Sequence, residues 1–255
     1  MSIVLKINPE YARLASEVED VLSRFDADGE TVFAGRNVLK RFVCSDGTKI
    51  VVKRFGHLPL FRRLIYSTIS SSKARKAFDK GLKFIERGFK TPDPVAYVEV
   101  KHRGVLQDSY FVSLSSDAKS LFPELVEAER FDTSLANEVA SFMARLHMSG
   151  AVHGDPNLNN MLYSRSGDGS VEISVIDTNR SYFRKKLSKR RRLKNLMRVT
   201  HRRDLMRQIA GRYAELTGLD PVATVEKIFA MLEGFERSRK IRHRIKSIIL
   251  RRPVD

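Results

Sequence analysis

The chain has 255 residues and a mass of 29.1 kDa, enough for one large domain or for two small lobes with real cores. Its 42% of apolar and 30% of charged residues exclude a disordered or fibrous protein. The single cysteine, Cys44, excludes an intramolecular disulfide, and the scattered histidines lack metal-ligand spacing, which excludes a zinc module. Residues 1–9 hold no basic stretch before a long apolar one, and no apolar run approaches the length of a membrane span. We therefore expect no signal peptide, no spanning helix and a cytoplasmic protein.

The net charge is +17, and nearly all of it lies near the C-terminus. Residues 180–255 carry 23 basic and 7 acidic side chains, whereas residues 1–179 carry 24 and 23. The excess is densest in residues 180–203. A solvated helix face is the simplest interpretation, but so concentrated a patch favours a polyanionic partner: nucleic acid, an acidic membrane surface or a phosphorylated substrate.

Short β-rich segments predict that the first half of the chain is mostly strand. A strand over residues 2–6 is followed by a helix expected over residues 9–25. The pair Asp46-Gly47 between two β-rich runs predicts a hairpin. Helical spacing of apolar residues predicts a helix over residues 72–88. The remaining predicted strands are residues 31–34, 38–44, 49–55, 95–100 and 110–114.

The pattern changes after Ser115. Ser134 is predicted to cap a helix whose apolar face is formed by Leu135, Val139, Phe142, Met143 and Leu146. A short strand is expected at residues 171–176, with basic helices after it. We therefore predict an α+β protein of two lobes with a cleft between them. Residues 1–115 form an antiparallel sheet with one main helix, and residues 116–255 form a mainly helical lobe.

Polar residues suited to phosphate chemistry follow the predicted helix. Residues 153–160 read HGDPNLNN, and Asp177 ends the strand predicted at residues 171–176. Carboxylate and amide oxygens are ligands for Mg²⁺, whose shell is completed by water and phosphate oxygens. A carboxylate that is not on the metal can orient an attacking hydroxyl and take its proton. The pattern indicates a divalent-metal nucleotide site.

These segments resemble the catalytic loop, His-x-Asp-x₄-Asn, and the following metal-binding strand end of the protein-kinase-like superfamily. The resemblance implies ATP and Mg²⁺ as cofactors and a two-lobed kinase-like fold with a reduced helical lobe. By this resemblance Asp155 is the catalytic base, and His153 braces the loop. Asn160 and Asp177 are the metal ligands.

The resemblance extends to the first half of the chain. Val51-Val52-Lys53 is similar to the third-strand lysine that holds the phosphates of ATP, and Asp79 is its implied acidic partner, with Glu86 as the fallback. The other implied nucleotide-binding residues are the phosphate-covering turn Gly35, Arg36 and Asn37, and Leu114 at the expected hinge beside the adenine.

The sequence differs from ordinary protein kinases at several motifs, and these differences narrow the choice of kinase family. Only Gly35 remains of a multi-glycine loop, Thr178-Asn179 stands in place of Phe-Gly after Asp177, and no Ala-Pro-Glu follows. These departures favour kinases of small molecules and glycolipids. From about Gly35 to Arg180 the chain resembles the bacterial lipopolysaccharide kinase family, which phosphorylates Kdo or heptose of the inner core. The segments that carry this likeness are residues 90–96, 152–160 and 176–180.

The resemblance implies a glycolipid acceptor, Kdo- or heptose-bearing lipid A, and an enzyme bound peripherally to the cytoplasmic face of the inner membrane. Basic residues of the segment 180–203 would hold that anionic surface, each contributing about 1 kcal/mol near it: Lys185, Lys186, Lys189, Arg190, Arg191 and Arg192. Apolar residues between them would pack or enter the interface: Leu187, Leu193, Leu196 and Met197.

Two other functions compete with this one. The first is a small atypical protein kinase of the ribosome or tRNA machinery, in which the basic tail binds RNA; residues 177–180 favour the glycolipid kinase over it. The second is a kinase-like fold kept as a non-catalytic binding module, against which the complete set of expected catalytic residues argues.

Overall fold

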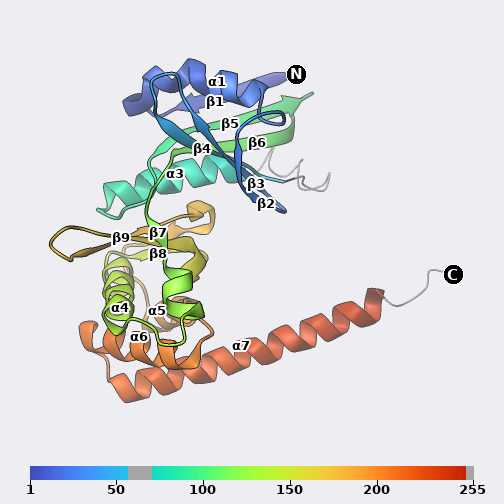
Figure 1. Cartoon of the computed structure of the whole chain (residues 1–255). Helices are drawn as coiled ribbons and strands as arrows, with labels where there is room; N and C mark the ends of the chain where they lie inside the picture. The colour runs from blue at the N-terminus through green and yellow to red at the C-terminus, as the bar shows by residue number, and fades with distance from the viewer. Residues whose placement is uncertain (57–70, 251–255) are drawn as a thin grey trace. The chain divides into compact units, whose positions relative to one another are not determined.

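The computed structural model describes residues 1–56 and 71–250 (Figure 1). The chain forms two compact units, and the first is discontinuous: it consists of Met1–Lys119 and Ser174–Tyr182, while Ser120–Ile173 and Phe183–Asp255 form the second. The return segment is joined to the first unit by a parallel bridge between Lys90 and Ser174. The first unit therefore extends past the predicted boundary at residue 115. It also includes residues 174–182, which the prediction assigned to the helical lobe.

A six-stranded antiparallel sheet forms the centre of the first unit, with strand order β1-β5-β6-β4-β3-β2. Each predicted strand of this half is present, with bounds shifted by a few residues. The predicted hairpin is confirmed, because Gly47 has a φ of 81° and the Asp46 carboxylate accepts the N–H of Thr48 at 2.8 Å. The strands are β1 (Ser2–Ile7), β2 (Glu30–Ala34), β3 (Val38–Val43), β4 (Lys49–Arg54), β5 (Pro94–His102) and β6 (Val105–Leu114).

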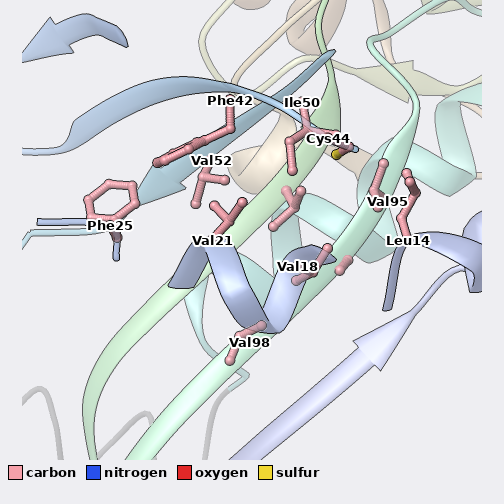
Figure 2. Packing of buried hydrophobic residues seen from close by; sticks show 12 residues of the cluster. Leu14, Val18, Val21, Phe25, Phe42, Cys44, Ile50, Val52, Val95 and Val98 are labelled. Atoms are coloured by element: carbon pink, nitrogen blue, oxygen red, sulfur yellow. The ribbon is translucent and has the colours of Figure 1, made fainter. Parts of the chain in front are cut away.

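Helices α1 (Ala15–Ser23) and α3 (Lys73–Glu86) lie on opposite sides of this sheet (Figure 1). Because side chains alternate along a strand, Ile50 and Val52 of β4 enter the core that α1 covers, and Figure 2 shows them beside Val18 and Val21. The α3 side holds a second cluster: Phe55, Ala74, Ala77, Phe78 and Tyr97. Lys53 falls between Val52 and Arg54, and its ammonium lies 5.2 Å from the ring centroid of Phe55. Lys53 is thereby placed on the α3 side.

The predicted helix over residues 9–25 is divided in two. A 3₁₀ segment (Pro9–Leu14) precedes α1, and within this segment Tyr11 has non-helical angles (φ −115°, ψ 23°). Asn8 caps the first piece by accepting the N–H of Glu10. Helix α3 begins after Ser72, whose hydroxyl accepts the N–H of Arg75 at 3.1 Å.

In the described part of the second unit the α-helices are α4 (Thr133–Met148), α5 (Lys189–Leu196), α6 (Arg203–Leu216) and α7 (Pro221–Leu250), and a short π-helix, η2 (Pro123–Glu127), precedes them. The predicted cap of α4 is wrong by two residues: Asp132, not Ser134, accepts the N–H of Leu135. The strands outside the large sheet are β7 (Lys119–Ser120), β8 (Ala151–Val152), β9 (Met161–Arg165), β10 (Val171–Val175) and β11 (Tyr182–Phe183). They form the sheets β10-β9-β7 and β11-β8.

The apolar face predicted for α4 is buried in full, and Ile209 and Tyr213 of α6 are buried as well. The apolar residues of the basic segment are also core residues: Leu187, Leu193, Leu196 and Met197 are each exposed by 6% or less. They pack inside the unit, whereas most of the cationic side chains of that segment are exposed. Among the described helices, none combines the length and the hydropathy needed to cross a membrane.

Candidate active site

In the first unit, Lys53 and Asp177 form an ion pair, with 2.7 Å between Nζ and Oδ1. Lys53 is supplied by the central strand β4, and its side chain is 15% exposed. Asp177 follows β10 and precedes the short 3₁₀ turn η4 (Thr178–Arg180). The two residues are 124 positions apart in the chain, so the return of residues 174–182 to the first unit is what brings them together.

Asp177 has a left-handed backbone conformation (φ 58°, ψ 44°), which is unfavourable for a residue with a Cβ atom. Its neighbours hold it there. The amide of Asn179 donates to Asp177 Oδ1 at 3.1 Å, and the hydroxyl of Thr178 donates to the carbonyl of Ala77 on α3 at 3.2 Å. The first contact orients the Asp177 carboxylate, and the second fixes the turn that follows it to α3. Within the described chain, Oδ2 of this carboxylate has no hydrogen-bond donor.

The structure does not bring either predicted acidic partner to Lys53. Asp79 lies 3.6 Å from Arg75, one turn earlier on α3, and Glu86 lies 2.8 Å from Lys83. Both carboxylates are about half exposed or more. Helix neighbours of opposite charge at this spacing pair readily with each other, and Asp177 takes the place beside Lys53.

The turn Gly35-Arg36-Asn37 joins β2 to β3 and is fastened to the end of β4. Asn37 Oδ1 accepts the N–H of Gly56 at 3.2 Å. A Cβ atom at Gly56 would overlap the carbonyl oxygen of Arg36, so glycine is required for this approach. The predicted phosphate-covering turn is therefore fixed to the strand that carries Lys53.

Leu114 ends β6 opposite Ile50 of β4 and packs against the core on the α1 side. Lys53 is on the α3 side. The structure therefore does not place the predicted adenine contact on the face of the sheet that carries the lysine.

In the second unit, the loop that follows β8 is folded around Asp155. The buried His153 accepts the backbone N–H of Asp155 on Nδ1 at 3.3 Å. The amide of Asn160 donates to the Asp155 carbonyl at 2.9 Å. The Asp155 carboxylate accepts from Arg198 on Oδ1 at 3.3 Å, and in the described chain its Oδ2 has no donor. One oxygen is thus oriented and the other is open to a ligand.

Helix α5 and the turn after it hold this loop at successive residues. Asn195 donates to the carbonyl of His153 at 2.8 Å, and Arg198 donates to the carbonyl of Gly154 at 3.1 Å as well as to Asp155. Sequence reasoning missed Arg198 and Asn195 because it treated the basic segment as a surface. No local pattern identifies them, since more than 40 residues separate each from its partner.

A buried polar network extends from Asn195 to α4 and α6. His147 contacts Asn195 Oδ1 through Nε2 at 3.0 Å and the Tyr213 hydroxyl through Nδ1 at 2.9 Å. Since the Asn195 amide donates to the loop, its oxygen accepts, so Nε2 of His147 carries the proton and Tyr213 donates to Nδ1. Burial lowers the pKa of His147 to about 4 and raises that of Tyr213 to about 12. Both are therefore neutral at physiological pH.

The polar groups of each unit suit the cofactors that a kinase site needs. Asp177 Oδ2 in the first unit and Asn160 Oδ1 in the second accept no hydrogen bond in the described residues, so both are open to a cation. The same part of the chain contains no cluster of three His, Cys, Asp or Glu. Mg²⁺ does not need one, because one or two protein oxygens with water and phosphate complete its shell. The ammonium of Lys53 suits phosphate oxygens.

A comparison with protein-family models gives a match over most of the chain. A model of the family described as "Lipopolysaccharide kinase (Kdo/WaaP) family" matches residues 28–217, which include Lys53, Asp155, Asn160 and Asp177. No curated protein sequence matches the chain.

A solved structure of WaaP shares the fold. A structure of WaaP in complex with acyl carrier protein is similar over 93% of this chain and 99% of that chain, with a TM-score of 0.60 and 19% identity. The Rio2 kinase of Chaetomium thermophilum, in its ADP/Mg²⁺-phosphoaspartate complex, matches over 85% of this chain and 75% of that chain, with a TM-score of 0.47 and 16% identity.

Proposed function

Because the chain belongs to the lipopolysaccharide kinase (Kdo/WaaP) family, we propose that it transfers the γ-phosphoryl group of ATP to a hydroxyl of Kdo or heptose in the lipopolysaccharide inner core. The observation that carries the proposal is the geometry around Asp155. Arg198 orients one oxygen of this carboxylate, and the other oxygen accepts no donor within the described residues. A carboxylate held in this way can receive the proton of an attacking hydroxyl.

Each residue has a defined part in the transfer. Asp155 accepts a hydrogen bond from the sugar hydroxyl and takes its proton as the oxygen–phosphorus bond forms, while the bond to the β-phosphate oxygen breaks and ADP leaves. Lys53 orients the phosphates of ATP. Asp177 and Asn160 hold Mg²⁺, which when bound neutralises charge on the phosphate oxygens. His153 braces the loop that carries Asp155.

The acceptor also explains the charge of the chain. A lipid A precursor is anionic and lies in a membrane leaflet, so we place the enzyme peripherally on the cytoplasmic face of the inner membrane. The cationic side chains of residues 180–203 support this location. The apolar residues between them are buried in the core, so the contact with a membrane would be made by the cations. Binding through exposed cations should weaken as salt is added.

A phosphoryl-transfer experiment tests the proposal. Purified protein is incubated with labelled ATP, Mg²⁺ and a bacterial extract that contains envelope and ribosomes, and glycolipid, protein and RNA are then separated. Asp155→Asn serves as the control, because it keeps the shape of the side chain and removes the base. We expect label in the glycolipid from the wild type and at least about 100-fold less from the variant. Label in protein would instead support the ribosome-type kinase, and equal label from both proteins would refute the role of Asp155.

A further inference from the structure

A groove between α5 and α7 in the second unit has an apolar floor and a cationic rim. Its volume is about 970 Å³. The apolar lining, called the floor here, consists mainly of Leu193 of α5, Met197 just after it, and Met231 and Phe235 of α7. Along α7 the groove runs from Ala223 to Ser238, which corresponds to about 22 Å of helix. It is separate from the residues assigned to phosphoryl transfer.

The rim carries four cations and no carboxylate: Lys189, Arg190 and Lys194 from α5, and Lys227 from α7. None of the four forms an ion pair with another described residue. The nearby acids Glu233 and Glu236 are instead directed to Arg203 of α6, at 3.9 and 3.1 Å. Uncompensated cations around one opening attract an anion.

Gly234 also lines the groove. It lies in the interior of α7, where glycine costs about 1 kcal/mol relative to alanine. No atom stands within 4 Å of where its Cβ would be, so packing does not require glycine there. A helix-interior glycine without a steric reason, lining an apolar groove, points to a ligand that uses the space.

We propose that this groove binds one molecule of an acidic membrane phospholipid, with its phosphate at the cationic rim and an acyl chain on the floor. The chemistry of the lining selects this occupant. Apart from Ser238 at one end, the floor lacks uncharged polar side chains that could pair with the backbone of an extended peptide, whereas an acyl chain brings no groups that need hydrogen bonds. The thioethers of Met197 and Met231 adapt to a flexible chain. The inference deepens the proposed function and rests on it for the presence of a membrane.

The test uses the full chain without ATP, so that vesicle binding is measured apart from catalysis. Vesicles of phosphatidylcholine alone, or mixed with phosphatidylglycerol, are sedimented with the protein. We expect binding to the acidic vesicles only. Gly234→Leu should fill the groove and weaken binding by about fivefold or more, while its melting temperature stays at or above that of the wild type because leucine favours helix. Gly211→Leu, at an open position of α6 outside this groove, is the matched control and should bind like the wild type.

A second pair of variants separates the groove from net charge. Lys227→Glu and Lys240→Glu make the same charge change on the same helix, but only Lys227 lines the groove. We expect the first to lose about fivefold more binding than the second. Equal losses, or wild-type binding by Gly234→Leu, would overturn the inference. The inference would also be overturned if a poly-glutamate peptide bound in the groove and the vesicles did not. That result would favour an acidic protein partner. If the protein shows no phosphoryl transfer but still binds vesicles in this pattern, the proposed kinase activity is refuted and the proposed lipid binding in the groove is retained.

Discussion

His147 should make the stability of the protein fall as the pH drops below about 6.5. Burial lowers its folded-state pKa to about 4, the hydrogen bond to Asn195 opposes the shift, and the charge of Arg192 adds to it. The unfolded chain takes up a proton as the pH falls through about 6.5, whereas the folded chain does so only near 4. Between about pH 8 and pH 5 the free energy of unfolding should therefore decrease by about 2 kcal/mol from this group alone, and by about 3 kcal/mol once the pH is below 4.

Urea unfolding at about pH 8 and pH 5 measures this contribution when the wild type is compared with His147→Gln. Glutamine keeps one donor and one acceptor but does not titrate, and every other ionisable group is common to both proteins. The wild type should lose about 2 kcal/mol more than the variant between the two pH values. Tyr213, with a pKa of about 12, stays neutral throughout. If the two proteins lose the same stability, His147 is not buried in the neutral form and the network to the loop is wrong.

Three further changes test the site. Asp177→Asn should keep its fold, since asparagine tolerates the left-handed conformation, but should lose phosphoryl transfer by about 100-fold or more; near-normal transfer would contradict its role. Arg198→Ala should lower kcat about tenfold with little change in KM for ATP, and Arg198→Lys should restore part of it; an effect confined to KM would argue against positioning of Asp155. Gly56→Ala should cost about 1–3 kcal/mol in thermal unfolding, because the new methyl meets the Arg36 carbonyl. Gly167→Ala, at an open position, should not.

The strands of the first unit were predictable because their signals are local. Several β-rich runs are followed directly by a turn residue, such as Gly35 or Ser45, and the Asp46-Gly47 hairpin needs nothing from the rest of the chain. The cap of α4 shows the limit of such signals: Asp132 and Ser134 are both good caps within one turn, and only the packing of the helix chooses between them.

The candidate site was predictable in its members but not in its contacts. The ordered motifs identify Lys53, Asp155 and Asp177. The pairing of Lys53 with Asp177 depends on a return of the chain across 124 residues, which no local spacing reveals. The contact of Arg198 with Asp155 is hidden for a different reason, because an arginine inside a strongly basic segment looks like any other surface charge.

The interrupted first unit has a consequence for how the protein is made. On the ribosome, residues 1–119 emerge long before residues 174–182, so the sheet is complete in sequence while Asp177 is still unsynthesised. At that stage Lys53 lacks its acidic partner Asp177. The carbonyl of Ala77 on α3 likewise lacks the hydrogen bond that the Thr178 hydroxyl donates in the finished protein. The contacts that Asp177 and Thr178 make with this unit can therefore form only after residues 174–182 have been synthesised. Any continuous fragment that contains the whole first unit must therefore also contain residues 120–173 of the second.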